Sequence, residues 1–164
     1  MHDYRTRRRI EFADTDLSGL THFARFFVFM ESAEHEFLRS LGAGPGTFTD
    51  EEGRRIGWPR AAASCEYLAP AHYGDEIEIE VRVVRKGTTS LTYGFELRRG
   101  ETLLARGRIT AVCCELGGPG GPRPIPLPAA LAARLSSAAG AGREPRGGSP
   151  GSRTASCTSR YVRF

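Results

Sequence analysis

One amphipathic segment, residues 23–41, constrains the fold of this chain more than any other feature of its sequence. Apolar side chains recur along it every three or four residues, at Phe23, Phe26, Phe27, Met30, Ala33, Phe37, Leu38 and Leu41. This spacing places them on one face of an α-helix, and Gly42 then provides a stop signal. Because each large side chain contributes about 1.5–3 kcal/mol when fully buried, we expect this helix to be the chief contributor to the core.

Charged and polar side chains interrupt the segment, so it cannot span a membrane. They are Arg25, Glu31, Glu34, His35, Glu36 and Arg39. No other apolar run reaches membrane length, and the polar N-terminus does not resemble a signal peptide. The four cysteines lack the spacing of a metal-binding motif. We therefore expect a cytoplasmic protein with reduced thiols, no bound metal and no association with a membrane.

The net charge of +4 comes from the C-terminal end of the chain. Residues 141–164 hold five arginines against one acid, Glu144, so residues 1–140 are close to neutral. The body therefore lacks the basic excess of a nucleic-acid-binding domain. The Gly, Ser, Arg and Pro content of the last residues is typical of disorder. We expect one domain over residues 1–139 and a disordered, dispensable tail over residues 140–164.

Four stretches after the helix alternate apolar and polar residues, as strands with one buried face do. The clearest is residues 76–83, where Ile77, Ile79 and Val81 alternate with charged side chains. The others are residues 61–67, 91–97 and 102–115; residues 5–13 form a strand before the helix, and residues 128–137 a short final helix. This order predicts an α+β domain in which a five-stranded antiparallel sheet covers one central helix.

Two carboxylates and a glycine precede the helix, at Asp14, Asp16 and Gly19. If Thr21 is the N-cap, the backbone N–H groups of residues 22–24 have no partners within the helix. Together with the helix dipole they would stabilise negative charge developing on a carbonyl oxygen. Asp16 could attack that carbonyl or take a proton from water. The alternative is that both aspartates are turn residues, and the local pattern alone favours it.

The residues around these aspartates resemble a known enzyme family. Glu11-Phe-Ala-Asp-Thr-Asp-x-x-Gly19, followed by Phe26-x-x-x-Met30-Glu31-x-Ala33, is similar to the 4-hydroxybenzoyl-CoA thioesterase branch of the hotdog-fold acyl-CoA thioesterases. Residues 64–70, 74–76 and 87–91 support the resemblance. It covers approximately residues 5–115, and its motifs are specific for the superfamily rather than for a substrate.

The resemblance implies hydrolysis of an acyl-CoA thioester to a free acid and coenzyme A, with no cofactor beyond the coenzyme A of the substrate. It also implies homodimers, alone or paired into tetramers, whose sheets join edge to edge and whose active sites lie at the subunit interface. The catalytic carboxylate maps onto Asp16, and the backbone N–H that polarises the thioester carbonyl maps onto Phe23. One bacterial branch has His or Tyr in place of Phe23, so only the backbone role carries over.

The resemblance and the helix start together give a set of candidate substrate-binding residues. They are Gly19, His22, Ala24, Arg85, Lys86, Thr89 and Ser90. His22 could hydrogen-bond to the substrate, or be a partly exposed residue at the helix start. Thr89 and Ser90 would line the site across the interface. Arg85 and Lys86 lie where this family contacts coenzyme A phosphates, which suits cations, but a solvated turn fits them equally well.

Two other acids and two other functions stay open at this point. Glu31 and Glu34 lie at the edge of or within the apolar stripe, and could face the dimer interface or bond to backbone.

A hydratase or dehydratase of the same fold would have an Asp/His pair on a longer loop, a pattern that we do not find. A non-catalytic acyl-CoA-binding module would usually be fused to an output domain, and we expect none in 164 residues. The G-x-S-x-G elbow of serine thioesterases is also missing.

Overall fold

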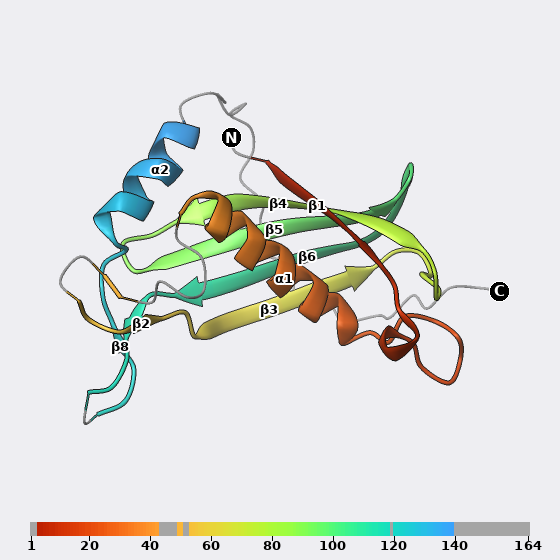
Figure 1. The fold of residues 1–164 in the computed structure, drawn as a ribbon, viewed down its shortest axis with the longest axis horizontal. Helices are drawn as coiled ribbons and strands as arrows, with labels where there is room; N and C mark the ends of the chain where they lie inside the picture. The colour runs from red at the N-terminus through yellow and green to blue at the C-terminus, as the bar shows by residue number, and fades with distance from the viewer. Residues whose placement is uncertain (1–2, 43–48, 51–52, 119, 140–164) are drawn as a thin grey trace, which may run out of the picture.

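The computed structural model describes residues 3–42, 49–50, 53–118 and 120–139 (Figure 1). The tail expected over residues 140–164 lies outside them. In chain order the elements are β1 (Tyr4–Arg9), a 3-10 turn η1 (Phe12–Asp14), α1 (Arg25–Ser40), β2 (Ile56–Gly57), β3 (Arg60–Tyr67), β4 (Glu76–Lys86), β5 (Ser90–Arg99), β6 (Thr102–Val112), β7 (Cys114–Glu115), β8 (Arg123–Pro124) and α2 (Ala129–Ala139).

Five of the strands form one antiparallel sheet in the order β1-β4-β5-β6-β3. The long helix α1 lies across one face of this sheet (Figure 1). The short strands β2, β7 and β8 form a second antiparallel sheet, and α2 lies at the same end of the molecule (Figure 1). The predicted α+β arrangement of one long helix and a five-stranded antiparallel sheet is confirmed.

The core lies between α1 and the sheet. From α1 it takes Phe26, Phe29, Met30, Ala33, Phe37 and Leu38, and from β4 and β5 it takes Ile77, Ile79, Val81, Leu91, Tyr93, Phe95 and Leu97. Successive side chains of a strand point to opposite faces, so the alternation in β4 and β5 directs every second residue toward the helix. The inward faces predicted for residues 76–83 and 91–97 are thus confirmed along most of their length.

The buried stripe of α1 differs from the predicted one at both ends. The helix begins at Arg25, so Phe23 lies before it and is 59% exposed. Leu41 follows the helix and is only partly buried. Phe29 and Glu34, which the pattern of apolar spacing did not include, take fully buried positions. The helical period is right, but the buried face is wider than predicted and includes one carboxyl group.

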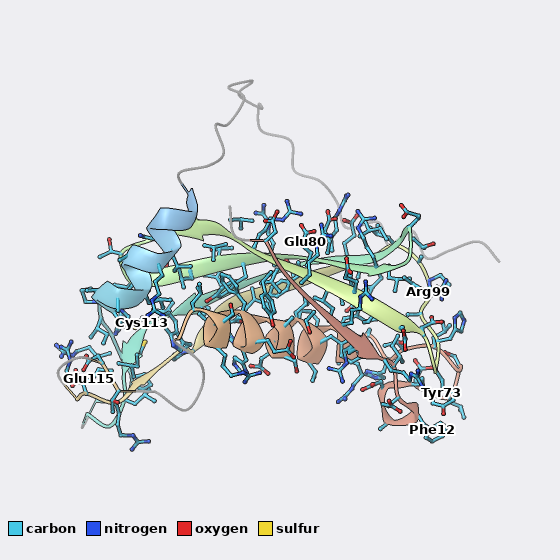
Figure 2. The ribbon with its side chains drawn as sticks, turned by 45° about the horizontal axis from the view of Figure 1, so that its top comes forward. Phe12, Tyr73, Glu80, Arg99, Cys113 and Glu115 are labelled. Carbon is cyan, nitrogen blue, oxygen red and sulfur yellow. The ribbon has the colours of Figure 1, made fainter. Side chains whose placement is uncertain are left out.

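The first and last strands are shorter than the sequence suggested. β1 ends at Arg9, and the 3-10 turn that follows directs Phe12 outward, where it is 79% exposed. Figure 2 shows Phe12 beside Tyr73 at the end of the molecule, and their rings meet edge to face at 6.5 Å. The strand expected over residues 102–115 is divided at Cys113 into β6 and β7, which belong to different sheets.

The two edges of the main sheet have different chemistry. Edge strand β1 carries three arginines on the face away from α1, each paired with a glutamate of β4. The pairs are Arg5–Glu80, Arg7–Glu78 and Arg9–Glu76, with N···O distances of 2.9, 3.3 and 2.9 Å. Figure 2 shows Glu80 on this outer face. Exposed ion pairs stabilise little, but charges along an edge hinder pairing with another strand.

The opposite edge, β3, is uncharged over its centre. Ala61, Ala62, Ala63 and Ser64 are exposed, although they belong to a sheet whose strands β4 and β5 bury every second residue along most of their length. Small uncharged residues leave the free backbone groups of this edge accessible to another strand. β3 also runs antiparallel to α1 along its length (Figure 1). The hydroxyl of Tyr67 donates to the carbonyl of Phe23 at 3.0 Å, and Arg60 contacts Glu34 at 2.8 Å.

Gly107 of β6 packs directly against Met30 of α1, so its substitution tests this packing. A Cβ at this position would clash with the sulfur of Met30 and lie 3.2 Å from the backbone oxygen of Ser64. We predict that Gly107→Ala lowers the free energy of unfolding by about 1–3 kcal/mol, measured by urea denaturation. Arg106→Ala, on the outer face of the same strand, is the control. Combining Gly107→Ala with Met30→Ala should recover part of the loss caused by the clash; a fully stable Gly107→Ala would contradict the packing.

Candidate active site

The segment between β1 and α1 folds into a compact loop that carries both aspartates. Thr15 and Thr21 pair in an isolated antiparallel bridge, and the N–H of Asp16 donates to the carbonyl of Leu20 at 2.9 Å. Gly19 has a φ of +78°, a conformation that glycine adopts without strain. Its N–H donates to the carbonyl of Asp16 at 3.0 Å. The loop is therefore a tight turn, and Gly19 acts in it through its backbone conformation.

The Asp16 carboxylate is exposed and held in one orientation by Ser18. Its Oδ1 accepts hydrogen bonds from the Ser18 hydroxyl and from the Ser18 N–H, the latter at 2.8 Å. These two bonds, the hydroxyl first, lower the pKa of Asp16, and the charge of His22 lowers it further. Within the described part of the chain, Oδ2 has no hydrogen-bond partner. Asp16 is therefore an ionised carboxylate at neutral pH with one oxygen available for chemistry.

Asp14 has a different environment, because its carboxylate is buried and fully engaged. Oδ2 accepts from the N–H of Glu11 at 2.9 Å, and Oδ1 accepts from Nε of Arg25 at 2.7 Å. Since Arg25 is the first residue of α1, Asp14 joins the loop to the helix start. These contacts support the interpretation of Asp14 as a turn residue, whereas Asp16 stays available.

The start of α1 is not capped as predicted. Ala24 is the N-cap of the helix and makes no side-chain capping bond. Thr21 is buried before it, and its N–H donates to the carbonyl of Ala71 at 2.8 Å. The prediction of Thr21 as the cap is wrong because the segment that precedes β4 binds this residue in a contact that local sequence does not reveal.

The three backbone N–H groups of residues 22–24 are consequently not equivalent. The N–H of His22 donates to the carbonyl of Asp14 at 2.8 Å, and the N–H of Ala24 donates to Nδ1 of His22 at 3.2 Å. The N–H of Phe23 has no partner among the residues that the structure describes. An unpartnered N–H beside the positive end of a helix is a donor for a developing oxyanion.

The side chains around this N–H hold the helix start in place. The ring of His22 stacks on that of Phe23, with centroids 4.5 Å apart. Tyr67 donates to the carbonyl of Phe23, which ties the loop to edge strand β3. Ala24 contributes no polar side chain, and its N–H is used by His22. His22 thus orients the helix start and also lies close enough to Asp16 to lower its pKa.

The other predicted binding residues lie at the far end of the sheet. Arg85 and Lys86 end β4, Thr89 lies in the β4–β5 turn and Ser90 begins β5. This hairpin is at the end of the sheet where Arg60 begins β3, opposite the end that holds Tyr67 and the Asp16 loop (Figure 1). Lys86 donates to the carbonyl of Ala132 in α2 at 2.9 Å. Within one chain, therefore, these residues do not meet Asp16.

A second polar cluster lies between the C-terminal half of α1 and the start of β3, and consists of Glu31, Glu34 and Arg60. The sequence did not predict that these three residues meet. Glu34 is fully buried, and its Oε1 accepts from Arg60 at 2.8 Å; Arg60 also contacts Glu31 at 3.2 Å. Burial raises the pKa of Glu34 to about 7, although Arg60 opposes the shift. The Oε2 of Glu34 and the hydroxyl of Tyr93 are buried, and neither has a partner in the described residues. The signal in the sequence was a carboxylate inside an apolar stripe.

A cavity of about 200 Å³ opens beside this pair. Its apolar lining is Leu38, Ile56, Gly57, Trp58 and Leu116, and its polar lining is Glu31, Glu34, His35 and Arg60. The molecule thus has an exposed carboxylate at one end of α1 and a cavity with a buried carboxyl group nearer the other end.

Comparison with known proteins decides the family. The model of the family described as "Thioesterase superfamily" matches residues 18–106, more than half of the chain. The chain belongs to the thioesterase superfamily. Its fold is the hotdog fold of that family, and the predicted thioester hydrolase is confirmed.

Its relatives carry related names. The chain is 28% identical to the 1,4-dihydroxy-2-naphthoyl-CoA hydrolase of Synechococcus elongatus over 115 residues, which are 70% of this chain and 84% of that protein. It is 25% identical to the acyl-CoA thioesterase YbgC of Haemophilus influenzae over 109 residues, 66% of this chain and 79% of the relative.

Solved structures show the same fold. The dynemicin thioesterase superposes with a TM-score of 0.72 at 25% identity, covering 83% of this chain and 96% of its own. The 1,4-dihydroxy-2-naphthoyl-CoA thioesterase of Synechocystis has the same TM-score at 24% identity, with 82% and 96% covered. In the described part of this thioesterase, no helix has the length and apolar character needed to cross a membrane.

The raised pKa of Glu34 predicts a pH-dependent stability. A carboxyl group whose pKa rises on folding stabilises the folded state at low pH, and this stability is lost as the pH rises from about 4.5 through about 7. The total loss is about 3 kcal/mol, since one pKa unit is equivalent to ~1.4 kcal/mol. The stability of Glu34→Gln relative to that of the wild type should therefore increase as the pH rises from 5 to 8. Melting temperatures measure this, and Glu31→Gln is the control; a pH-independent difference for Glu34→Gln would contradict it.

Proposed function

We propose that this thioesterase hydrolyses acyl-CoA thioesters to a free carboxylic acid and coenzyme A. The names of its relatives support this class of substrate. The observation that carries the proposal is the pairing, in one short loop, of an oriented ionised carboxylate with an unpartnered backbone N–H. Hydrolysis of a thioester needs both a base or nucleophile and a donor for the carbonyl oxygen.

Asp16 supplies the first of these functions. Its free Oδ2 either attacks the thioester carbonyl carbon or takes a proton from a water that attacks. In the first route the C–S bond breaks, the thiolate of coenzyme A leaves, and water then hydrolyses the mixed anhydride. In the second route water adds directly and the thiolate leaves from the tetrahedral intermediate. In both, the thiolate takes up a proton and the acid is released.

The N–H of Phe23 supplies the second function. Both routes place negative charge on the former carbonyl oxygen, and a preorganised donor stabilises that charge without reorganisation during the reaction. Ser18 and Gly19 position Asp16 through the turn, and His22 positions the helix start through Ala24. The side chain of Phe23 is exposed and offers an apolar surface beside the thioester.

A second copy of the chain completes the site. The charged edge β1 is poorly suited to pairing, whereas the small, uncharged residues of β3 favour it. Antiparallel pairing of β3 with its copy gives a dimer with one continuous sheet. It brings the β4–β5 hairpin of one subunit, with Thr89, Ser90, Arg85 and Lys86, toward the Asp16 loop of the other. The cations of Arg85 and Lys86 can then bind coenzyme A phosphates.

Substitution of the two aspartates tests this mechanism. Asp16→Asn keeps the shape of the side chain but removes its charge, so kcat should fall by roughly 10²–10⁴ with little change in melting temperature. Asp14→Asn weakens a buried contact to Arg25 and should lower stability by about 1–3 kcal/mol, with a smaller effect on kcat. The assay is thiol release from a panel of acyl-CoAs that includes 1,4-dihydroxy-2-naphthoyl-CoA. A folded, fully active Asp16→Asn would exclude Asp16 as the catalytic residue.

A further inference from the structure

Tyr67, the last residue of β3, contacts the residue that carries the proposed oxyanion donor. Its hydroxyl donates a hydrogen bond to the carbonyl of Phe23 at 3.0 Å. The proposed hydrolysis uses the N–H of Phe23 and gives no role to this carbonyl. A contact so close to the donor, made from another element of the fold, needs an explanation.

Hydrogen bonds hold both peptide groups that flank the Cα of Phe23. In the first group, the N–H is the proposed donor, and the carbonyl of His22 accepts from the N–H of Arg25 at 2.8 Å. In the second group, the N–H of Ala24 donates to Nδ1 of His22 at 3.2 Å. The carbonyl of Phe23 belongs to this second group, and it accepts from Tyr67. Because the two planar groups are joined at one Cα, the orientation of the second limits the directions in which the N–H of the first can point.

Of these contacts, the one from Tyr67 comes from outside the segment. The other two join residues 22–25 to each other, so they keep the local shape but do not set its orientation relative to the sheet. In a continued helix the N–H of Phe27 would donate to the carbonyl of Phe23, but here it donates to the carbonyl of Ala24 at 3.2 Å. In the part of the chain that the structure describes, the carbonyl of Phe23 is therefore held by Tyr67.

The ring of Tyr67 fixes the position of its hydroxyl. It packs edge to face against the ring of Phe26 in the first turn of α1, with centroids 5.3 Å apart. The backbone of Tyr67 pairs with Ala105 of β6, so the residue is part of the main sheet. The side chain is 42% exposed, and a hydrogen bond in contact with water contributes little to stability. Loss of the hydroxyl alone should therefore affect the direction of the donor more than the stability of the fold.

The direction of the donor matters because the charge on the carbonyl oxygen develops in the transition state. Loss of one oxyanion donor lowers kcat by roughly 10²–10³. A donor that is kept but points in a less favourable direction should cost less, about tenfold, because it still reaches the oxygen.

We propose that Tyr67 is a positioning residue of this thioesterase: its hydroxyl holds the peptide groups around Phe23 so that the N–H of Phe23 points at the thioester carbonyl oxygen. This inference rests on the proposed function and adds a residue to the same site. Tyr67 acts through Phe23 and does not touch the reacting atoms.

Removal of the hydroxyl tests the proposal. Tyr67→Phe keeps the ring against Phe26 but removes the donor, so thiol release in a single turnover, with enzyme in excess, should be about tenfold slower than in the wild type. The steady-state KM and the melting temperature should change little. Tyr73→Phe is the matched control and should react at the wild-type rate, because Tyr73 is also exposed but its ring contacts Phe12.

Two stable analogues of the acyl-CoA that the wild type cleaves fastest separate positioning from a merely structural role. In the first, a ketone, a methylene group replaces the thioester sulfur and the carbonyl oxygen is kept. In the second, a thioether, a methylene group replaces the carbonyl; for a benzoyl substrate it is S-benzyl-coenzyme A. Tyr67→Phe should weaken binding of the ketone about threefold or more, since a misdirected N–H makes a poorer hydrogen bond, and leave binding of the thioether unchanged. Calorimetry measures both dissociation constants.

The outcomes separate this inference from the function on which it rests. A Tyr67→Phe variant that reacts at the wild-type rate overturns the role of Tyr67. Equal weakening of both analogues also overturns it, because that is the result of a general loosening of the site. Either result leaves the thioesterase function standing when the wild type releases thiol. No thiol release by the wild type from any acyl-CoA of the panel overturns the proposed function, and this inference with it.

Discussion

The contact between α1 and the edge strand β3 sets the position of the helix, and of the loop before it, on the sheet. Hydrogen bonds tie the strand to this part of the chain at both ends: the hydroxyl of Tyr67 donates to the carbonyl of Phe23, just before the helix, and Arg60 donates to Glu34 within it. Apolar packing against β4 and β5 supplies most of the stability, but it is not directional. The two polar contacts fix where the helix begins relative to the strand, and so where Asp16 lies relative to the free edge of the sheet.

Much of the fold could be predicted because its local and global signals agree. Alternation in β4 and β5 and the helical period of α1 both direct large apolar residues to one core. The errors occur where a tertiary contact overrides the local pattern. Thr21 looked like a cap, but it binds Ala71. Phe12 continued the alternation of the first strand, but the 3-10 turn after Arg9 exposes it.

The kinds of group in the candidate site could be predicted from the sequence, but which of them are available to a substrate could not. The spacing of Asp14 and Asp16 before an amphipathic helix indicated a carboxylate near free N–H groups. Which aspartate is available depends on Arg25, which engages Asp14, and which N–H is free depends on the carbonyl of Asp14. These are contacts across the loop, and a local pattern of turn residues gives no information on them. Glu34 was visible only as a charge among apolar residues, because its partner Arg60 lies 26 positions along the chain.

The two carboxyl groups that matter here have environments that shift their pKa values in opposite directions. Exposed Asp16 is kept ionised by Ser18, while burial raises the pKa of Glu34 to about 7. Both shifts follow from where the chain places each side chain relative to α1. Asp16 lies in the loop before the helix, where the hydroxyl and the N–H of Ser18 stabilise its ionised form. Glu34 lies on the buried face of the helix, where the cost of removing a charge from water exceeds the stabilisation that Arg60 provides.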